Sequence, residues 1–340
     1  MIAQPGPRGP SDEQRTPRGP GSATIDHHLQ AFAAERQGVG QTMERSERVK
    51  RNTIESQAIL QAFAADLEWV SQVVVGDLRP KIEAKIPRTR KLDACLGQFR
   101  RIDAWLRTLC KLSEPMHFQA TAAGARSMLE LAVDLVLLAS DQNAAERLYD
   151  WEWSAKYKHA TAVKRFYETV DDPVPPENAE AVTFAVREEA KIESLRRKQG
   201  WLDGKNKPYH PPRWTKRNLD ADCVEADKWP HRGAFSFVRF YETRFRTLCW
   251  QVHGSAFVGR TIGADVFPFL SAQALLDASD LAVIGASATL HVFDLWTRDV
   301  KAAFEKFASE RHRRRNDLFL KARAAQQAVA ADDPAAGKSE

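Results

Sequence analysis

Apolar residues recur every three or four positions along most of the chain, which is the spacing of amphipathic helices. The stripe is clearest over residues 42–78 and predicts one long helix there. The same spacing predicts a second helix over residues 92–109. The two stripes consist of Leu60, Phe63, Leu67, Val70 and Val74, and of Leu92, Leu96, Phe99, Ile102, Leu106 and Leu109. Each of these helices should therefore bury one face.

The middle of the chain is expected to form the centre of a helical bundle. Pro115 is acceptable in a first helical turn, and a helix is predicted from there to about Ser140. Residues 128–139 are apolar on almost every side, as in a helix surrounded by other helices. A further helix is predicted over residues 142–170. The stretch "DDPVPPEN" ends it, because proline is not tolerated inside a helix.

The second half of the chain continues as helices joined by one long connection. A charged helix is expected over residues 178–199, followed by an irregular connection over 200–233 that is rich in Trp, Pro, Lys and Arg. A helix around residues 238–253 and two long helices over 269–296 and 299–328 follow. No stretch alternates apolar and polar residues for long enough to predict a sheet. The predicted fold class is all-α, a multi-helix bundle.

Changes in composition suggest how the bundle is divided. The Pro/Gly/Arg-rich residues 1–24 and the tail 329–340 should be disordered. Residues 25–112 are expected to form N-terminal helices, and residues 301–328 a charged C-terminal helix. Between them, residues 113–300 are expected to form the bundle core, including the basic loop 200–233. The sequence leaves open whether residues 25–112 form a separate hairpin or join the same bundle.

Composition narrows the class of protein. The chain has 340 residues, 43% of them apolar and 28% charged, with a net charge of +5, which is ordinary for a soluble globular protein. Four cysteines without paired spacing indicate a reducing compartment and no disulfide framework or zinc site. No signal peptide and no uncharged apolar run of about 18 residues is present. A cytoplasmic protein is therefore expected, with no membrane partner, metal or cofactor.

The stretch "FRTLCWQVHGS" contains the first candidate site. On a helical wheel with about 100° per residue, Glu242, Arg246 and His253 fall together at the border of an apolar arc. A half-desolvated but reachable His suits general acid–base catalysis, and Arg can stabilise charge on a phosphate. Arg followed by His after four to six residues is the motif of the HEPN nucleases, although about two or three chance matches are expected in this composition. A surface ion pair between Glu242 and Arg246 is the alternative.

A second candidate lies in "RSMLELAVD". Arg126, Glu130 and Asp134 step by four and form one polar line along the most apolar predicted helix. Buried charges are costly unless they are paired. Arg126 and Glu130 could pair locally, Glu130 could meet Arg246 or a His of another helix, or the line could be the solvent strip of the helix. In a catalytic site, Glu130 and Glu242 would orient Arg246 or His253.

Basic residues concentrate between residues 191 and 217, where nine Lys/Arg face only Glu193 and Asp203. Trp and Tyr are interleaved with them, which is the pattern that single-stranded RNA binding requires. Tryptophans in a long loop often pin the loop to the core instead, and a charge run usually means solvation. A denser patch, "RHRRR" at 311–315, is expected to be a solvated helix face that could touch phosphate. The candidate binding residues are Arg196, Arg197, Lys205, Lys207, Arg213, Trp214, Lys216 and Arg217.

Two of these stretches resemble a family of all-helical bacterial proteins catalogued as a domain of unknown function. That family has a central helix beginning Arg-Ser-x-x-Glu, a later segment like "YRxLSxxxHG", and often a Trp and short helix between them, for which "RWTKRNLDADCVEA" is the counterpart here. The matching residues are Arg126, Ser127 and Glu130, then Arg246, Leu248, His253 and Gly254. The resemblance spans about residues 113–260. Phe245 and Cys249 stand where the family favours Tyr and Ser, which removes a hydroxyl one turn before His253.

These observations lead to two expectations of different kinds. The first is a HEPN-like protein that binds RNA or cleaves it without a metal, in a defence or toxin setting, with its site formed across a homodimer. In that case His253 is the general acid or base and Arg246 stabilises the phosphate. The second is a non-enzymatic interaction or regulatory module, in which the Arg, Glu and His residues form a buried structural network.

Overall fold

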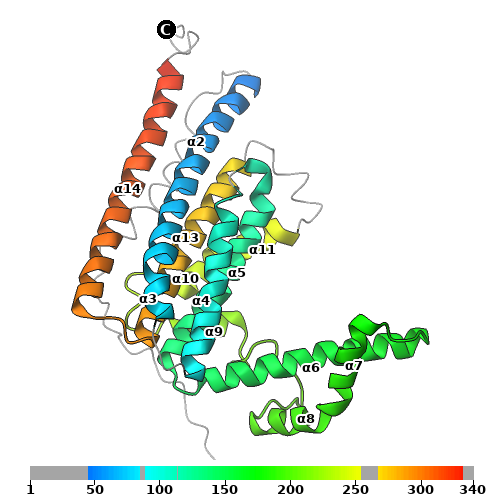
Figure 1. Ribbon diagram of the computed structural model, residues 1–340. Helices are drawn as coiled ribbons and strands as arrows, with labels where there is room; N and C mark the ends of the chain where they lie inside the picture. The colour runs from blue at the N-terminus through cyan, green and yellow to red at the C-terminus, as the bar shows by residue number, and fades with distance from the viewer. Residues whose placement is uncertain (1–44, 85–88, 113, 254–266, 332–340) are drawn as a thin grey trace, which may run out of the picture. The chain divides into compact units, whose positions relative to one another are not determined.

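The computed structural model describes residues 45–84, 89–112, 114–253 and 267–331. One compact unit, Glu44–Arg232 together with Ser236–Glu340, contains every helix discussed below. All regular elements of the described ranges are helices, apart from one isolated bridge between Leu202 and Pro208, and turns or irregular segments join them. The predicted all-α class is confirmed (Figure 1).

The elements follow the chain in a simple order. The first half contains α2 (Arg45–Ser71), the π-helical η1 (Gln72–Leu78), α3 (Arg79–Glu83), α4 (Arg90–Leu109), the 3₁₀ turn η2 (Pro115–His117), α5 (Phe118–Ser140) and α6 (Ala144–Val170). The second half contains α7 (Pro176–Arg187), α8 (Glu189–Lys198), α9 (Leu219–Ala226), α10 (Phe237–Phe240), the π-helical η3 (Tyr241–Phe245), α11 (Arg246–His253), α13 (Phe267–Val292) and α14 (Arg298–Ala331).

Helices α5 and α13 form the centre of the bundle. They pack against each other, with α4 against both, α2 against α13 and α11 against α5. The apolar residues of 128–138 are all buried, as predicted for a central helix. The stripe predicted along α2 and η1 also faces inward: Leu60, Leu67, Val70 and Val74 are buried. The N-terminal helices α2 and α4 therefore pack in the same bundle as α5.

Small residues allow the central helices to approach closely. A Cβ at Gly285 of α13 would lie 2.5 Å from Ile102 of α4 and 3.2 Å from Leu135 of α5. A Cβ at Gly124 of α5 would lie 2.7 Å from Leu109. Any larger residue at these positions would have to displace Ile102 or Leu109, so the role of both glycines is in packing rather than in backbone freedom.

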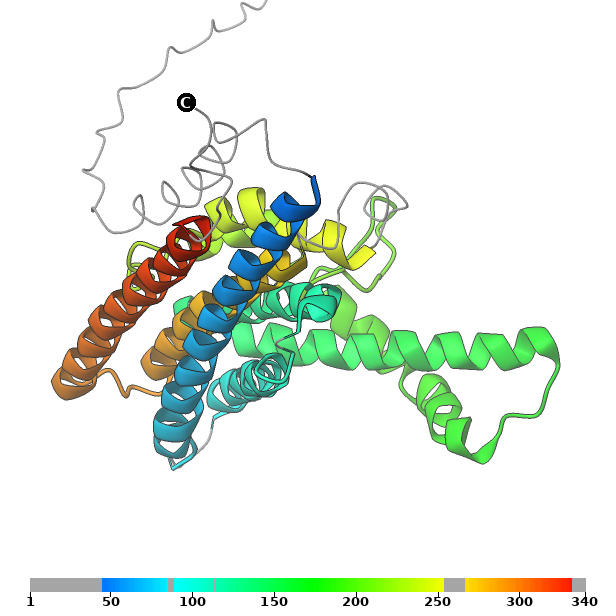
Figure 2. The same cartoon turned by 90° about the horizontal axis from the view of Figure 1, so that it is seen from above.

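Helix α14 lies beside α2 in both views of the structure (Figures 1 and 2). Trp69 of α2 stacks on Phe307 of α14 with ring centroids 4.8 Å apart. The guanidinium of Arg314 lies 4.8 Å from the centre of the Trp69 ring. The predicted charged C-terminal helix is thus attached to the bundle through its aromatic and basic side chains.

Helices α7 and α8 have their main contacts with α6 and with each other. Phe184 and Ala185 of α7 are buried against α6, and Trp153 meets Phe184 edge-on at 5.1 Å. The single helix predicted over residues 178–199 is instead two helices, which meet at Glu188. With this break, Phe184 and Ile192 are both buried.

The remaining bounds differ modestly from those expected. The connection over 200–233 contains α9, which matches the short helix expected there from the resemblance. Helix α14 continues to Ala331, so the first residues of the tail predicted from residue 329 are helical. The other residues of the two predicted tails, 1–24 and 332–340, lie outside the described part of the chain.

Two helical stretches, Gln57–Glu83 and Phe267–Val292, are long and apolar enough to cross a membrane by length and composition. No membrane span was expected from the sequence. A core helix of a soluble protein passes the same test, and 72% of the most apolar window of the second stretch is buried within the bundle. These two helices are therefore weak evidence for a membrane span.

Candidate functional site

The helix that carries the Arg/His candidate begins at a firmly capped end. Ser236 Oγ accepts a hydrogen bond from the backbone N–H of Arg239 at 3.2 Å. The carboxylate of Asp227 accepts hydrogen bonds from the backbone N–H groups of Phe237 (2.7 Å) and Val238 (3.2 Å). These bonds satisfy N–H groups that have no partner within the helix.

Two arginines that are only two positions apart have different environments, one in the π-helical η3 and one at the start of α11. Arg244, in η3, points into the bundle and pairs with Asp277 of α13 at 2.7 Å. Burial raises the pKa of Asp277 to about 6, although Arg244 acts in the opposite direction. Arg246 begins α11 and its side chain is 68% exposed. The charge that reaches the core is therefore Arg244, which the sequence analysis did not single out.

The pair predicted between Glu242 and Arg246 forms. Their charged groups are 3.0 Å apart, one helical turn from each other, and the Glu242 side chain is 49% exposed. This is the geometry of the surface ion pair that the sequence left open as an alternative. His253 is the last residue of α11, and its side chain lies outside the described part of the structure.

The polar line along α5 divides into two parts. Arg126 and Glu130 are partly exposed and lie 3.9 Å apart. Arg126 also lies over the ring of Phe245, at 5.5 Å from its centre, so this part of α5 faces the end of η3. Within the described chain, the ion-pair partners are Arg126 for Glu130 and Glu242 for Arg246. The direct Glu130–Arg246 pairing that the sequence suggested is therefore not formed.

Asp134, the third residue of the polar line along α5, is buried. It accepts hydrogen bonds from residues of the basic connection 200–233. Arg213 donates to Asp134 at 2.6 Å and to Asp222 of α9 at 2.6 Å. Trp214 Nε1 donates to Asp134 at 2.9 Å, and Arg217 donates to Asp222 at 2.8 Å. Asp222 is completely buried. Two largely buried carboxylates are therefore neutralised by Arg213, which is also largely buried, and by the more exposed Arg217.

Burial raises the pKa of Asp134 to about 6, against the opposing effects of Arg213 and Trp214. A carboxyl with this pKa is still ionised at neutral pH. Since Arg213 and Trp214 are occupied within the chain, their side chains hold the connection to α5 and α9. Arg213 and Trp214 are largely buried, whereas their predicted role in RNA binding would require exposed side chains.

The other candidate binding residues fall into two groups. Arg196 donates to Ser154 Oγ at 2.8 Å and lies over the ring of Tyr157, and Lys216 donates to the carbonyl of Gly200 at 2.8 Å. These contacts anchor the connection. The second group is solvent-exposed and consists of Arg197, Lys205 and Lys207, with Arg217 partly so.

Ser154 and His210 form a Ser–His contact that the sequence did not suggest. His210 Nδ1 lies 3.1 Å from Ser154 Oγ, and burial lowers the pKa of His210 to about 4, helped by Lys158 and Arg196. A neutral imidazole beside a hydroxyl resembles a nucleophile and its base. Ser154 has no exposed surface, however, so no substrate can reach it. The contact is structural.

The "RHRRR" patch is not the solvated face that the sequence predicted. Arg315 donates to Asp66 of α2 at 3.1 Å and to Asp280 of α13 at 2.9 Å. Arg311 donates to Asp280 at 2.8 Å and to Ser279 at 2.7 Å. Both arginines are nearly buried, whereas Arg313 is exposed. The patch joins α14 to two other helices because every third or fourth residue of a helix faces the same way.

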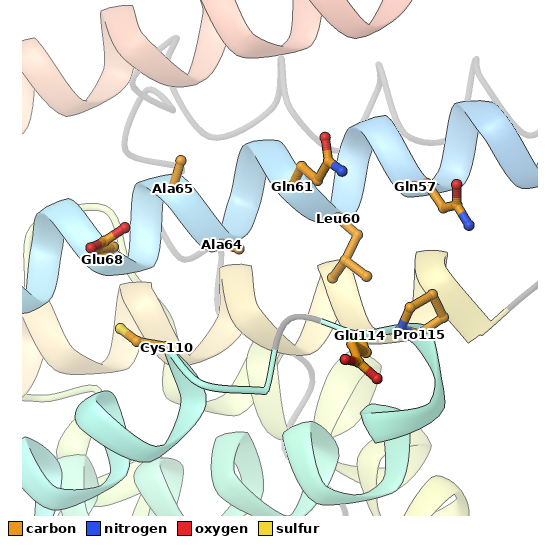
Figure 3. A pocket seen from close by; sticks show the side chains of 9 residues that line it. All are labelled: Gln57, Leu60, Gln61, Ala64, Ala65, Glu68, Cys110, Glu114 and Pro115. Carbon is orange, nitrogen blue, oxygen red and sulfur yellow. The ribbon is translucent and has the colours of Figure 1, made fainter.

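A pocket of about 560 Å³ lies between α2 and the connection from α4 to α5 (Figure 3). Leu60 forms part of its floor, and two small residues, Ala64 and Ala65, line the α2 side. Its remaining lining residues are Gln57, Gln61, Glu68, Cys110, Glu114 and Pro115. Among the described residues, no group of three or more His, Cys, Asp or Glu could hold a metal ion.

Comparisons with known proteins give no further assignment. No protein family, no curated protein and no solved structure matches this chain.

Proposed function

We propose that this chain is a non-enzymatic helical interaction protein that binds a protein partner at the turn between α6 and α7. The observation that carries the proposal is a group of large apolar side chains left in solvent at this turn. Phe166 is 58% exposed, Val170 42% and Val174 36%. Phe166 and Val170 are one helical turn apart on the same face of α6. Adjacent exposed apolar groups of this kind mark interaction surfaces.

The turn is held in one conformation, which favours binding. Asp171 ends α6 in the left-handed region with φ 53°. Three prolines in the segment 173–176 restrict the backbone that follows. Asn178 Nδ2 donates to the Tyr167 hydroxyl at 2.9 Å and ties the start of α7 to the end of α6. A surface that is already ordered loses less entropy when a partner binds.

The charges around the turn indicate the chemistry of the partner. Four exposed acidic residues neighbour the apolar group in the sequence: Glu168, Asp171, Asp172 and Glu177. The nearby basic side chains are Lys164, which pairs with Glu168 at 3.5 Å, and Arg165. We therefore expect the partner protein to present an apolar recess with Lys or Arg residues at its rim.

The positions of the other charged residues support a non-enzymatic role. The buried arginines Arg213, Arg244, Arg311 and Arg315 are all bound to aspartates that hold helices together. Arg246, the proposed phosphate-binding residue, is an exposed member of a local pair. The buried arginines form a structural network of other residues than the sequence suggested, because Arg126–Glu130 and Glu242–Arg246 are partly exposed local pairs.

Site-specific photocrosslinking in the native cell tests the proposal. A benzophenone amino acid at position 166 is expected to give one discrete protein adduct, and Val170→Glu should abolish it without changing the melting temperature. Thr183, exposed on α7, is the matched control position and should give no adduct. No adduct at position 166, or an adduct that survives Val170→Glu, would contradict the proposal.

A second candidate is RNA binding, with or without HEPN-like cleavage by Arg246 and His253 across a homodimer. One observation favours it: Lys205 and Lys207 are exposed on a tight hairpin. The carboxylate of Asp203 accepts hydrogen bonds from the backbone N–H groups of both lysines, each at 2.8 Å. Exposed basic side chains on a hairpin with an ordered backbone can contact phosphates.

Purified protein incubated with single-stranded RNA separates the two candidates. The interaction proposal expects no cleavage and only weak, salt-sensitive binding. Cleavage that disappears in Arg246→Ala and His253→Ala, with unchanged melting temperatures, would instead establish the ribonuclease. Tight binding that persists at physiological salt and that Lys205→Ala/Lys207→Ala weakens, without any cleavage, would instead favour an RNA-binding role.

A further inference from the structure

A second pocket, of about 280 Å³, lies where α5 ends and α6 begins. Four segments contribute to it: the end of α5, the start of α6, the connection around residues 214–217, and α9. The lining residues are Leu137, Ser140, Asp141, Arg147, Trp214, Arg217 and Glu225. The pocket is at the small end of the range for ligand sites, so only a small molecule would fill it.

The wall of this pocket is fixed by the buried network. Trp214 is 3% exposed, and its Nε1 is bound to Asp134. The guanidinium of Arg147 lies over the Trp214 ring, 5.7 Å from its centre, and is paired with Asp141. Together with Leu137, the Trp214 ring gives the pocket an apolar side that does not have to rearrange.

Arg217 and Glu225 give the pocket opposite charges with unused hydrogen-bonding capacity. Arg217 donates to Asp222 through Nε, which leaves its two Nη groups without a recorded partner within the described chain. Glu225 Oε2 accepts from Lys228 at 2.7 Å, and its Oε1 has no recorded partner there. Although both residues line the pocket, no ion pair links Arg217 to Glu225 across the described residues.

The balance of charge indicates the kind of ligand. Arg147 and Arg217 are matched by Asp141 and Glu225, so the lining is neutral as a whole. A simple anion would meet carboxylates as well as arginines. A molecule with both a carboxylate and an ammonium group would satisfy the Nη donors of Arg217 and the free oxygen of Glu225 together.

We propose that this pocket binds a small zwitterion, a free α-amino acid with a short apolar side chain. Its carboxylate contacts Arg217, its ammonium group contacts Glu225, and its side chain lies against Leu137 and Trp214. The proposal is independent of partner binding at the α6–α7 turn. Failure of either proposal leaves the other unchanged, because the two are measured by different experiments.

Isothermal titration calorimetry of the full chain with L-alanine, L-valine and L-leucine tests the site. Butyrate and butylamine, which each carry only one of the two charges, serve as comparison ligands. At least one amino acid is expected to bind at a single site, and each comparison ligand about tenfold more weakly or not at all. Absence of saturable binding by all three amino acids, or butyrate binding as tightly as they do, would overturn the proposal.

Two variants locate the binding within the pocket. Glu225→Gln is expected to weaken amino-acid binding about tenfold while the melting temperature is unchanged, because the Glu225–Lys228 pair is a surface pair. Glu193→Gln removes a similar exposed carboxylate, paired with Arg197, and should leave binding unchanged. Equal affinities of wild type and Glu225→Gln would show that the amino acid binds elsewhere and would overturn the assignment.

Discussion

Asp134 and Arg213 show how a single residue pair can determine a local fold. A carboxylate buried in the bundle is unfavourable without a cation, and Arg213 supplies one from a connection 79 residues further along the chain. The same guanidinium also neutralises the completely buried Asp222. The conformation of the connection around Arg213 is therefore set by two aspartates, one on α5 and one on α9.

Arg213→Ala should be among the most destabilising substitutions of a charged residue in this protein. It leaves Asp134 and Asp222 short of a buried partner, and the expected loss is about 3–5 kcal/mol in the free energy of unfolding. Arg246→Ala removes an exposed guanidinium and should change stability by less than about 0.5 kcal/mol. Urea unfolding followed by circular dichroism measures both. Similar losses for the two variants would contradict the assignment of Arg213 to a buried network.

The sequence could indicate that Asp134 needs a partner, but not which residue supplies it. The line Arg126–Glu130–Asp134 follows directly from helical spacing, and Arg126 and Glu130 do pair locally. The choice of Arg213 depends on the path of an irregular connection. Propensity and periodicity do not determine that path. The same reasoning explains why Arg244, rather than Arg246, reaches the core: the π turn of η3 has no clear signal in the residue pattern.

At the scale of elements, α14 is attached to the bundle by a four-charge network. Asp66 of α2 and Asp280 of α13 are bound by Arg311 and Arg315 of α14. The rest of the attachment is the aromatic stack between Trp69 and Phe307. Because α14 packs mainly against α2, these contacts are concentrated on one of its faces.

Arg315→Met should loosen α14 without unfolding the centre of the bundle. The substitution keeps an unbranched apolar side chain but leaves Asp66 and Asp280 to share Arg311 alone. Hydrogen exchange measured by mass spectrometry is expected to become faster in α14 and in the part of α2 beside it, while α5 remains protected. Lys301→Met, at an exposed position of α14, should leave the exchange pattern unchanged. Equal acceleration in α5 and α14 would show that α14 does not open separately.

Most helices could be predicted from the spacing of apolar residues, because a buried face repeats with the helical period. The stripes of α2, α4 and α5 face inward as expected, although Phe63 and Leu92 are only half-buried. The break between α7 and α8 could not be predicted: "VREEAKIE" contains no Gly or Pro and favours a continuous helix. Packing against α6 overrides that local preference, since Phe184 and Ile192 are both buried in the broken form.

For the whole molecule, the central helices bury two thiols that report on global unfolding. Cys95 and Cys223 have no exposed surface, and burial raises the pKa of each to about 12. Cys110 and Cys249 are only partly buried, and all four thiols are free. The reactive thiolate of Cys95 or Cys223 is therefore available only when the bundle opens.

Iodoacetamide labelling of the native protein at pH 8 should modify Cys110 and Cys249 but spare Cys95 and Cys223. Labelling in denaturing concentrations of guanidinium, which is the control, should modify all four. Peptide mass spectrometry identifies the labelled sites. If Cys95 is modified in native buffer as fast as Cys110, the burial of α4 against α5 and α13 is wrong.

The candidate sites bring together residues that are far apart in the sequence. They could therefore be predicted less well than the helices. Glu242 and Arg246 could be paired from their spacing, since both lie on one helix. The pocket beside Trp214 joins residues from Leu137 to Glu225, and no local pattern connects them. The interleaved Trp and Arg residues suggested RNA contacts, whereas Trp201 and Trp214 are buried. Composition alone does not distinguish a stacking surface from an anchor.

The two aspartates of helix α13 also affect what the nascent chain can do during synthesis. It is apolar enough to resemble a membrane segment, yet it contains Asp277 and Asp280. Each aspartate near the centre of a bilayer-spanning helix costs about 2.5–3.5 kcal/mol on an insertion scale. The partners of Asp280, Arg311 and Arg315, leave the ribosome only after α13. During synthesis, the still unpaired carboxylate of Asp280 therefore opposes lipid insertion, and it becomes the attachment point for α14 once the chain is complete.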